Sequence, residues 1–254
     1  MARSFTATQR ACLQALELPV WQRREWAMDE SVVEPVVVEP NMPESSEASS
    51  QTLSPRLDPQ TLDWPQLRQA VLSCAQCDLQ QTRTQAVFGV GVATPELVVV
   101  GEAPGAEEDR TGEPFVGRAG QLLDRMLAAI DCARTQNVFI TNVLKCRPPN
   151  NRDPHVNEIA ACRGWLLRQL ELLQPKAILC VGRFAAQTLL ETDQPLSRLR
   201  GPAQSLRVSS ERTVPVFVTY HPAYLLRTPA DKAKAWVDLK NLRAALRARS
   251  GNGS

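Results

Sequence analysis

Four of the seven cysteines in this 254-residue chain have a spacing that could hold a metal centre. They are Cys74, Cys77, Cys146 and Cys162. The first two form a C-x-x-C pair, the third opens a proline-rich run that ends at Arg152, and the fourth lies sixteen positions after the third. Four thiolates suit either a tetrahedral zinc ion or a cubane iron–sulfur cluster, and the spacing does not separate the two. The other three, Cys12, Cys132 and Cys180, have apolar or helical surroundings and are expected to pack as small hydrophobic side chains.

Two glycine-containing motifs could shape a ligand pocket. In Gly101–Asp109 two glycines and a proline let the backbone turn sharply and approach a ligand, and the carboxylates could orient a water molecule. In Gly112–Gly117 an aromatic residue, Phe115, stands between a proline and a glycine and could stack on a planar base.

Two more motifs supply an amide and an imidazole. The Asn142 side chain offers both a donor and an acceptor, which suits the reading of a base edge. The run His221–Arg227 contains a candidate catalytic imidazole, an arginine and apolar side chains that could enter a duplex and stabilise an extruded base. The other histidine, His155, stands at a predicted helix start, and we expect a structural or surface role for it.

Short apolar runs precede these motifs at 97–100, 138–140, 177–181 and 214–218. Continuous apolar strands suit a parallel sheet covered on both faces, and the segments between them have helical periodicity. We therefore expect an α/β domain over residues 61–248, with three α/β/α layers around a central four-stranded parallel sheet. Because ligands of such sheets bind beyond the carboxyl ends of the strands, the motifs should meet at one edge.

The first sixty residues differ in composition from the rest. Residues 29–60 are rich in proline, glutamate and serine, which predicts a disordered linker. Within residues 1–28, the apolar segment 9–24 is interpreted as a frayed helix or as a docking peptide for a replication protein. Its stretch 14–21 is faintly similar to the docking segment of psi, a bacterial clamp-loader subunit. Residues 249–254 are expected to form a flexible tail.

Charge is unevenly distributed along the chain. Residues 1–60 carry five Arg against nine Asp and Glu, a net charge of −4, and residues 61–254 carry 24 Lys and Arg against 18 Asp and Glu, a net charge of +6. The basic excess thus falls on the part with the motifs, as a domain that binds a polyanion requires. No window approaches eighteen consecutive apolar residues, so no membrane association is expected.

Cysteine use also indicates a compartment. Neither a secretory signal nor a disulfide framework is expected, since the start of the chain lacks a basic stretch followed by an apolar run. We expect a monomer in a reducing, bacterial-type cytoplasm that associates with the nucleoid while it acts.

Together these motifs resemble those of the family-4 uracil-DNA glycosylases, the iron–sulfur branch of that superfamily. The resemblance covers roughly residues 64–246 and includes, in order, the C-x-x-C pair, GEAPGAEED, TGEPFVGRAGQLL, TNVLKCRPPNNRDP and HPAYLLR. It implies that the four cysteines ligate a [4Fe-4S] cluster of structural role. It also implies that the substrate is uracil-containing DNA and that the reaction is hydrolysis of the N-glycosidic bond.

The resemblance implies roles for individual residues. His221 would donate a hydrogen bond to uracil O2 as negative charge develops there, and Glu102 would lie in the water-binding turn. The base would be bound by Ala103, Pro104, Gly105, Glu108, Phe115 and Asn142, with Phe115 stacking, Asn142 excluding cytosine and Glu108 barring the thymine methyl group. The DNA backbone and the duplex would be contacted by Lys145, Arg147, Arg152, Tyr224, Leu225 and Arg227, with Leu225 or a neighbour inserted into the stack.

One position departs from other branches of the superfamily, which place a water-activating Asp or Asn where this chain has Ala103. Either Glu102 or backbone carbonyls must then orient the water, or a dissociative reaction needs little help from a base. Two other interpretations compete: a non-catalytic, metal-stapled nucleic-acid-binding module tethered to replication proteins, and a redox protein whose cluster carries electrons.

Overall fold

The computed structural model describes residues 58–250, and the expectations for the docking segment, most of the linker and the end of the tail fall outside that range. A single sheet runs through the described part, with the strand order β1-β3-β2-β4-β6-β5. Its strands are β1 (Val90–Gly91), β2 (Leu97–Gly101), β3 (Val138–Asn142), β4 (Ala177–Val181), β5 (Gln204–Arg207) and β6 (Thr213–Thr219).

The four central strands are parallel and coincide with the four predicted apolar runs. The expected four-stranded sheet is nevertheless incomplete, because β1 and β5 pair antiparallel at the two edges. Every residue of β2, β3 and β4 is buried, whereas β5 alternates between half-buried and exposed positions, as edge strands do.

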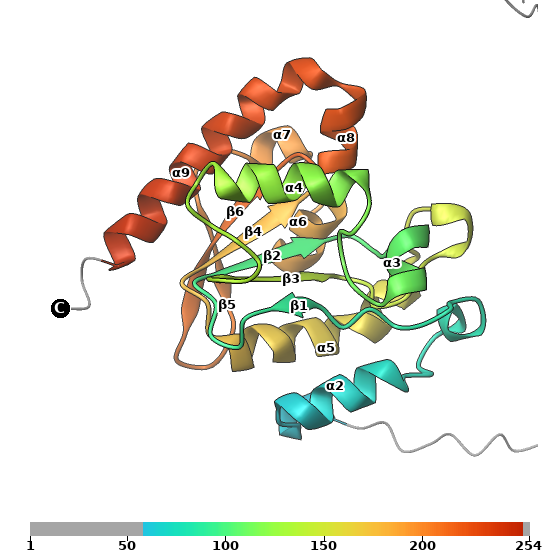
Figure 1. The fold of residues 1–254 in the computed structure, drawn as a ribbon. Coiled ribbons are helices and arrows are strands. Elements are labelled where there is room, and N and C mark those ends of the chain that lie inside the picture. The colour runs from blue at the N-terminus through green and yellow to red at the C-terminus, as the bar shows by residue number, and fades with distance from the viewer. Residues whose placement is uncertain (1–57, 251–254) are drawn as a thin grey trace, which may run out of the picture. The chain divides into compact units, whose positions relative to one another are not determined.

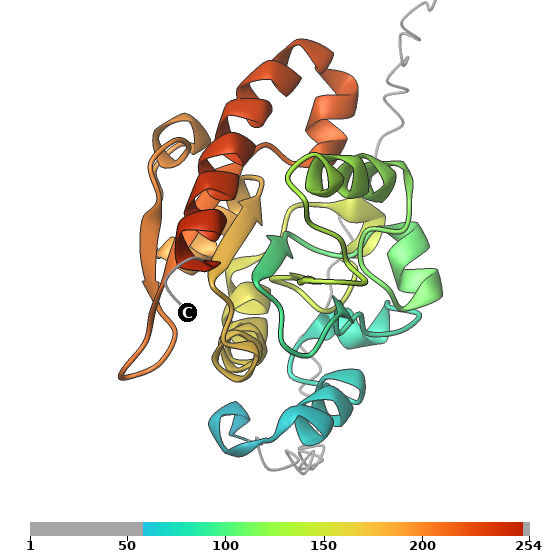
Figure 2. The same ribbon diagram turned by 60° about the vertical axis from the view of Figure 1, so that its left-hand side comes forward.

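Helices cover both faces of the sheet, which gives the predicted three layers (Figures 1 and 2). They are α2 (Trp64–Leu72), α3 (Ala106–Thr111), α4 (Arg118–Ala128), α5 (Val156–Leu173), α6 (Arg183–Leu190), α7 (Leu196–Leu199), α8 (Pro222–Arg227) and α9 (Lys232–Ser250). Val98 and Val100 face a core formed with α2, α5 and α6, and Leu97 and Val99 face a second core formed with α4, α8 and α9. The alternation follows from the two-residue period of a strand.

None of the helices within residues 58–250 is long and apolar enough to cross a membrane. Cys132 and Cys180 are buried in the two cores, as expected for small hydrophobic side chains. On α9 the side chains of Trp236 and Val237 are exposed.

Candidate active site and cysteine cavity

A pocket of about 450 Å³ lies at the carboxyl ends of β2, β3 and β6, and we call it the strand-end pocket. It is lined by Glu102, Ala103, Pro104, Gly105, Glu108, Phe115, Ala119, Asn142, Pro148, Asn151, Arg152, His221, Ala223, Tyr224 and Arg227. The structure therefore brings together all eight residues predicted to act in catalysis or base binding. The size suits a small planar ligand.

Glu108 fixes two walls of this pocket to each other. One carboxylate oxygen accepts a hydrogen bond from the Gly105 N–H (3.1 Å), and the other accepts from the Val116 (3.0 Å) and Gly117 (3.3 Å) N–H groups. The side chain thus bridges the turn after β2 and the loop before α4.

Phe115 is held in a strained backbone conformation. Its φ of 56° lies in the left-handed region, which costs a non-glycine residue on the order of 1–3 kcal/mol. Arg134 stabilises this conformation by donating to the Pro114 and Phe115 carbonyls at 3.2 and 3.1 Å. A Cβ on Gly120 would lie 1.7 Å from the Phe115 carbonyl oxygen, so only glycine lets α4 approach this loop. The constraint fixes the ring, whose centroid is 5.6 Å from that of His221.

Asn142 ends β3 and carries an unpaired acceptor. The residue is 2% exposed, and its Oδ1 has no hydrogen-bond partner among the described residues. A buried acceptor without a partner costs about 1–3 kcal/mol. A Cβ on the paired residue Gly101 would lie 2.3 Å from that oxygen, so glycine is required for this close approach. The amide is therefore positioned to receive an N–H from a ligand.

His221 is neutral and its tautomer is fixed. It caps the N-terminus of α8, and its Nδ1 accepts a hydrogen bond from the Ala223 N–H at 3.2 Å. Burial, with a smaller effect of Arg227, lowers the pKa of the imidazole to about 4. At neutral pH the single ring proton therefore resides on Nε2, which is left as a hydrogen-bond donor.

Glu102 can change protonation state near neutral pH. Burial, reinforced by repulsion from Asp153 and opposed by Arg183, raises the pKa of its carboxyl group to about 7. A half-buried carboxylate of this kind can accept a proton from a water molecule at neutral pH.

Only some of the residues predicted to contact DNA line the pocket. Arg152, Tyr224 and Arg227 line the pocket, but Arg147 does not, and its Nε donates to Asn151 at 2.8 Å. Arg152 also forms a two-point ion pair with the buried Glu158, at 3.0 and 2.6 Å.

The expectation that Lys145 faces the DNA backbone is wrong. Its side chain is only 1% exposed, and its Nζ donates to Thr141 Oγ1 (2.7 Å), the Asn142 carbonyl (2.7 Å) and Gln169 Oε1 (2.6 Å). A side-chain nitrogen that is buried among three oxygens cannot reach a phosphate at the surface. Lys145 instead fastens the end of β3 to α5.

The placement of Leu225 also needs correction. It is 1% exposed and belongs to the core beneath α8, whereas Leu226 is 36% exposed. Consecutive helical residues point about 100° apart, which lets Leu226 face solvent while Leu225 packs into the core. The exposed neighbour is the one that can enter a duplex.

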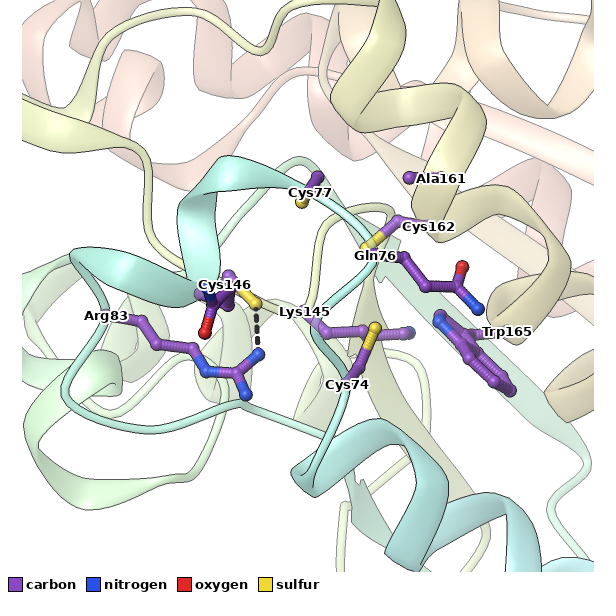
Figure 3. Close-up of a pocket in the computed structure, with 10 residues that line it drawn as sticks. Cys74, Gln76, Cys77, Arg83, Lys145, Cys146, Ala161, Cys162 and Trp165 are labelled. Atoms are coloured by element: carbon purple, nitrogen blue, oxygen red, sulfur yellow. Dashed lines mark hydrogen bonds between the residues drawn. The ribbon is translucent and has the colours of Figure 1, made fainter. Parts of the chain in front are cut away.

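All four predicted cysteine ligands line one narrow cavity, which we call the cysteine cavity (Figure 3). The thiols come from the segment after α2, the loop after β3 and helix α5, and they share the cavity with Gln76, Gln80, Arg83, Lys145, Ala161 and Trp165. Within residues 58–250 no group of three or more His, Cys, Asp or Glu side chains is placed to hold a single metal ion.

The surroundings of the thiols provide N–H donors. Arg83 Nη1 donates to Cys146 Sγ at 2.9 Å, and Trp165 Nε1 is buried without a partner in the part of the chain that the structure describes. Burial raises the pKa of the Cys162 thiol to about 12, so it keeps its proton at neutral pH unless a metal displaces it. An unpaired N–H beside four thiols fits a sulfur-rich, negatively charged group.

Several residues of both sites were not found from the sequence. Ala119, Pro148 and Ala223 line the strand-end pocket, but their apolar types carry no chemical signal, and Asn151 lies in a loop where nothing in the sequence distinguishes it from a surface asparagine. Arg83 and Trp165 reach the cysteine cavity only through tertiary packing.

Comparisons with known proteins agree with this geometry. The fold and pocket define an α/β protein that binds a small ligand at the carboxyl edge of its sheet. A family model, the uracil DNA glycosylase superfamily, matches residues 88–240. The type-4 uracil-DNA glycosylase of Archaeoglobus fulgidus is 46% identical over 176 residues, covering 68% of this chain and 87% of the relative.

Two further relatives refine the assignment. The type-4 uracil-DNA glycosylase of Sulfurisphaera tokodaii is 42% identical over 181 residues, 70% of this chain and 82% of the relative. A type-5 uracil-DNA glycosylase of Pyrobaculum aerophilum is 31% identical over 149 residues, 53% of this chain and 64% of the relative. The chain belongs to the uracil-DNA glycosylase superfamily and, within it, to the type-4 family.

Proposed function

We propose that this protein is a DNA-repair glycosylase that flips uracil out of DNA, hydrolyses its N-glycosidic bond and leaves an abasic site. The observation that carries the proposal is the meeting of Glu102, Phe115, Asn142 and His221 in one pocket. The type-4 relatives, whose names state this activity, support it.

His221 stabilises the leaving group. As the glycosidic bond breaks, uracil departs with negative charge and the sugar gains oxocarbenium character. A neutral imidazole that holds its proton on Nε2 can donate to uracil O2 without transferring that proton, so the interaction strengthens as the charge grows.

Asn142 and Phe115 select the base. The unpaired Asn142 Oδ1 suits the N3–H of uracil, while cytosine presents an acceptor at that position and would leave the amide unsatisfied. Phe115 offers its ring for stacking. Glu108 holds the turn after β2 against the loop before α4, and this wall is proposed to exclude the 5-methyl group of thymine.

Glu102 is proposed to orient the attacking water. Ala103 has no polar group, whereas the Glu102 carboxyl lines the pocket and has a pKa of about 7. Its ionised form can accept a hydrogen bond from water and stabilise the positively charged sugar.

We infer that the cysteine cavity holds a [4Fe-4S] cluster ligated by Cys74, Cys77, Cys146 and Cys162, because its lining offers four thiols from three segments. A cubane cluster gives each thiolate its own iron, which suits four thiols that surround a cavity without converging on one ion. When bound, the cluster supplies a covalent link between three segments of the chain. Arg83 and Trp165 supply N–H groups to it.

The DNA backbone is proposed to lie across the mouth of the pocket. Arg152, Tyr224 and Arg227 line that mouth, and Arg147 positions the adjacent loop through Asn151. The exposed Leu226, in place of Leu225, would fill the gap left by the flipped base. A cytoplasmic monomer that docks to a replication protein through residues 9–24 stays a prediction.

The test is uracil release under single-turnover conditions from matched oligonucleotides that carry uracil, thymine or cytosine opposite guanine. We expect free uracil and an alkali-labile site from the uracil substrate alone. Bound DNA without any product, from protein with a full complement of cluster, would favour a binding module instead. Product from thymine at a similar rate would overturn the selectivity assigned to Glu108.

A further inference from the structure

A second cavity, of about 200 Å³, lies on the outer side of α4 and α8. It is lined by Arg118, Gln121, Leu122, Arg125, Leu226 and Lys232, and we call it the basic groove. The four α4 residues recur at helical spacing, so they form one face of that helix. The groove thus has cations and an amide together with two apolar side chains.

Its three cations are free of acidic partners. Within residues 58–250 neither Arg118, Arg125 nor Lys232 has a carboxylate within 4.0 Å. The neighbouring acids are already paired. Asp124 binds Arg134 at 2.7 Å, and Asp231 binds Lys234 at 2.7 Å. Three exposed cations next to one another, without counter-charges, repel one another and attract an anion.

At two points a residue that lines the groove is followed directly in the sequence by a residue that lines the strand-end pocket. Ala119, which lines the pocket, directly follows Arg118, and Arg227, which lines the pocket, directly follows Leu226. The loop from Pro148 to Arg152 forms another wall of the pocket. A strand whose nucleotide enters the pocket could therefore continue into the basic groove.

The dimensions match a nucleic-acid backbone. Arg118 and Arg125 are seven residues apart, which is about 10 Å along a helix. Successive phosphates of one strand are spaced about 3.4 Å along the duplex axis, so with α4 aligned along that axis the two arginines would span about three nucleotide steps. The apolar side chain of Leu122 suits a deoxyribose ring between phosphates, and Leu226 lies where the groove meets the gap left by the flipped base.

We propose that Arg118, Arg125 and Lys232 bind the phosphates of the DNA strand that flanks the flipped uridine. The proposal rests on the proposed function, because it takes the pocket as the place where the base enters. It adds a binding site that extends the DNA contact beyond the pocket mouth, along α4.

The experiment uses full-length, cluster-containing protein with R118Q, R125Q, K232Q and the triple variant. The matched control is R207Q, since Arg207 is exposed on β5, where it pairs with the start of β6, away from the carboxyl edge. Single-turnover uracil release is measured against enzyme concentration at several salt concentrations. Two substrates are used: a duplex of about two helical turns, and a uracil trinucleotide that lacks most of the flanking phosphates.

We expect the triple variant to need at least tenfold more enzyme for half-maximal rate on the duplex, with the maximal rate unchanged. The slope of log affinity against log salt should fall by about 1 for each cation removed. The trinucleotide and R207Q should behave as wild type. A triple variant equal to R207Q on the duplex, or one equally impaired on the trinucleotide, would overturn the proposal.

Failure of the proposed function is distinguishable from failure of this site. Fluorescence anisotropy with the same duplex measures affinity whether or not uracil is released. If wild-type protein releases no uracil, the glycosylase assignment fails. A loss of duplex affinity confined to the groove variants would still support phosphate binding there, and wild-type affinity in the triple variant would overturn it.

Discussion

The strand-end pocket and the cysteine cavity are both built on the carboxyl end of β3, yet they are built for different occupants. The pocket is wide and is lined by both apolar and polar side chains, with a strained Phe115 and an unpaired Asn142. The cavity is narrow and lined by four thiols from three segments. One suits a ligand that enters and leaves, and the other suits a group that stays and stabilises the fold.

The buried side chain of Lys145 connects the two sites. Lys145 lines the cysteine cavity, and its Nζ donates to the carbonyl of Asn142, which lines the pocket. The comparison therefore predicts that substitutions in either site alone act separately, and that a substitution of Lys145 acts on both.

The largest effect is expected for His221→Ala. Loss of one donor to a developing anion reduces turnover by about 10²–10³-fold. DNA affinity and visible absorbance should stay near wild type, because the cysteine cavity is intact, while loss of the α8 cap should lower the free energy of unfolding by about 1 kcal/mol. Single-turnover rates and anisotropy measure the two quantities. Equal losses of rate and affinity would show that His221 serves binding.

Cys146→Ala should produce the opposite pattern. It removes a proposed cluster ligand and the acceptor of the Arg83 hydrogen bond, so we expect loss of the visible absorbance that a cluster would give and a fall of about 3 kcal/mol or more in the free energy of unfolding. Cys180→Ala is the matched control, since it also removes a buried thiol. It should keep the colour at a cost of about 1 kcal/mol. Stoichiometric zinc without iron in anaerobically prepared wild-type protein would contradict the cluster.

Lys145→Met should affect both sites by a smaller amount. Methionine fills much of the same volume but leaves three oxygens without their donor, which costs about 2–3 kcal/mol. We expect a lower melting temperature together with weaker discrimination between uracil and cytosine. A variant with lowered stability and unchanged base selectivity would show that the link to Asn142 carries no functional consequence.

The smallest effect expected is on the pH profile of uracil release. Glu102 is ionised above its pKa of about 7, so the rate should rise through that pH, and Glu102→Gln should flatten the rise. His221, with a pKa of about 4, stays neutral across the same range and should lower the rate only below about pH 5. A wild-type profile that is flat between pH 5 and 9 would exclude Glu102 as the group that orients water.

The central strands, and the meeting of the motifs that follow them, could be predicted from the sequence. The four central strands are continuous apolar runs because both of their faces are buried, and their carboxyl ends necessarily meet. The residues that follow them therefore converge. The edge strands carry no such signal, since β1 has two residues and β5 is half exposed.

The errors concern side chains whose environment depends on distant parts of the chain. Lys145 resembles a surface cation in the sequence, but its acceptor Gln169 lies on α5, 24 positions away. Leu225 and Leu226 are adjacent, and only the packing of α8 on the core decides which one is buried. The strained Phe115 depends on Arg134 and Gly120, which local patterns do not connect to it.

The unpaired oxygen of Asn142 has a thermodynamic consequence for the free enzyme. Since an empty pocket leaves this acceptor buried without a partner, the ligand-free protein is less stable than a form whose ligand donates an N–H there. Free uracil, the reaction product, should therefore raise the melting temperature. At one hundred times its dissociation constant it should add about 2.7 kcal/mol to the free energy of unfolding. Free cytosine should not raise the melting temperature. Released uracil would then inhibit the enzyme, whereas cytosine would not.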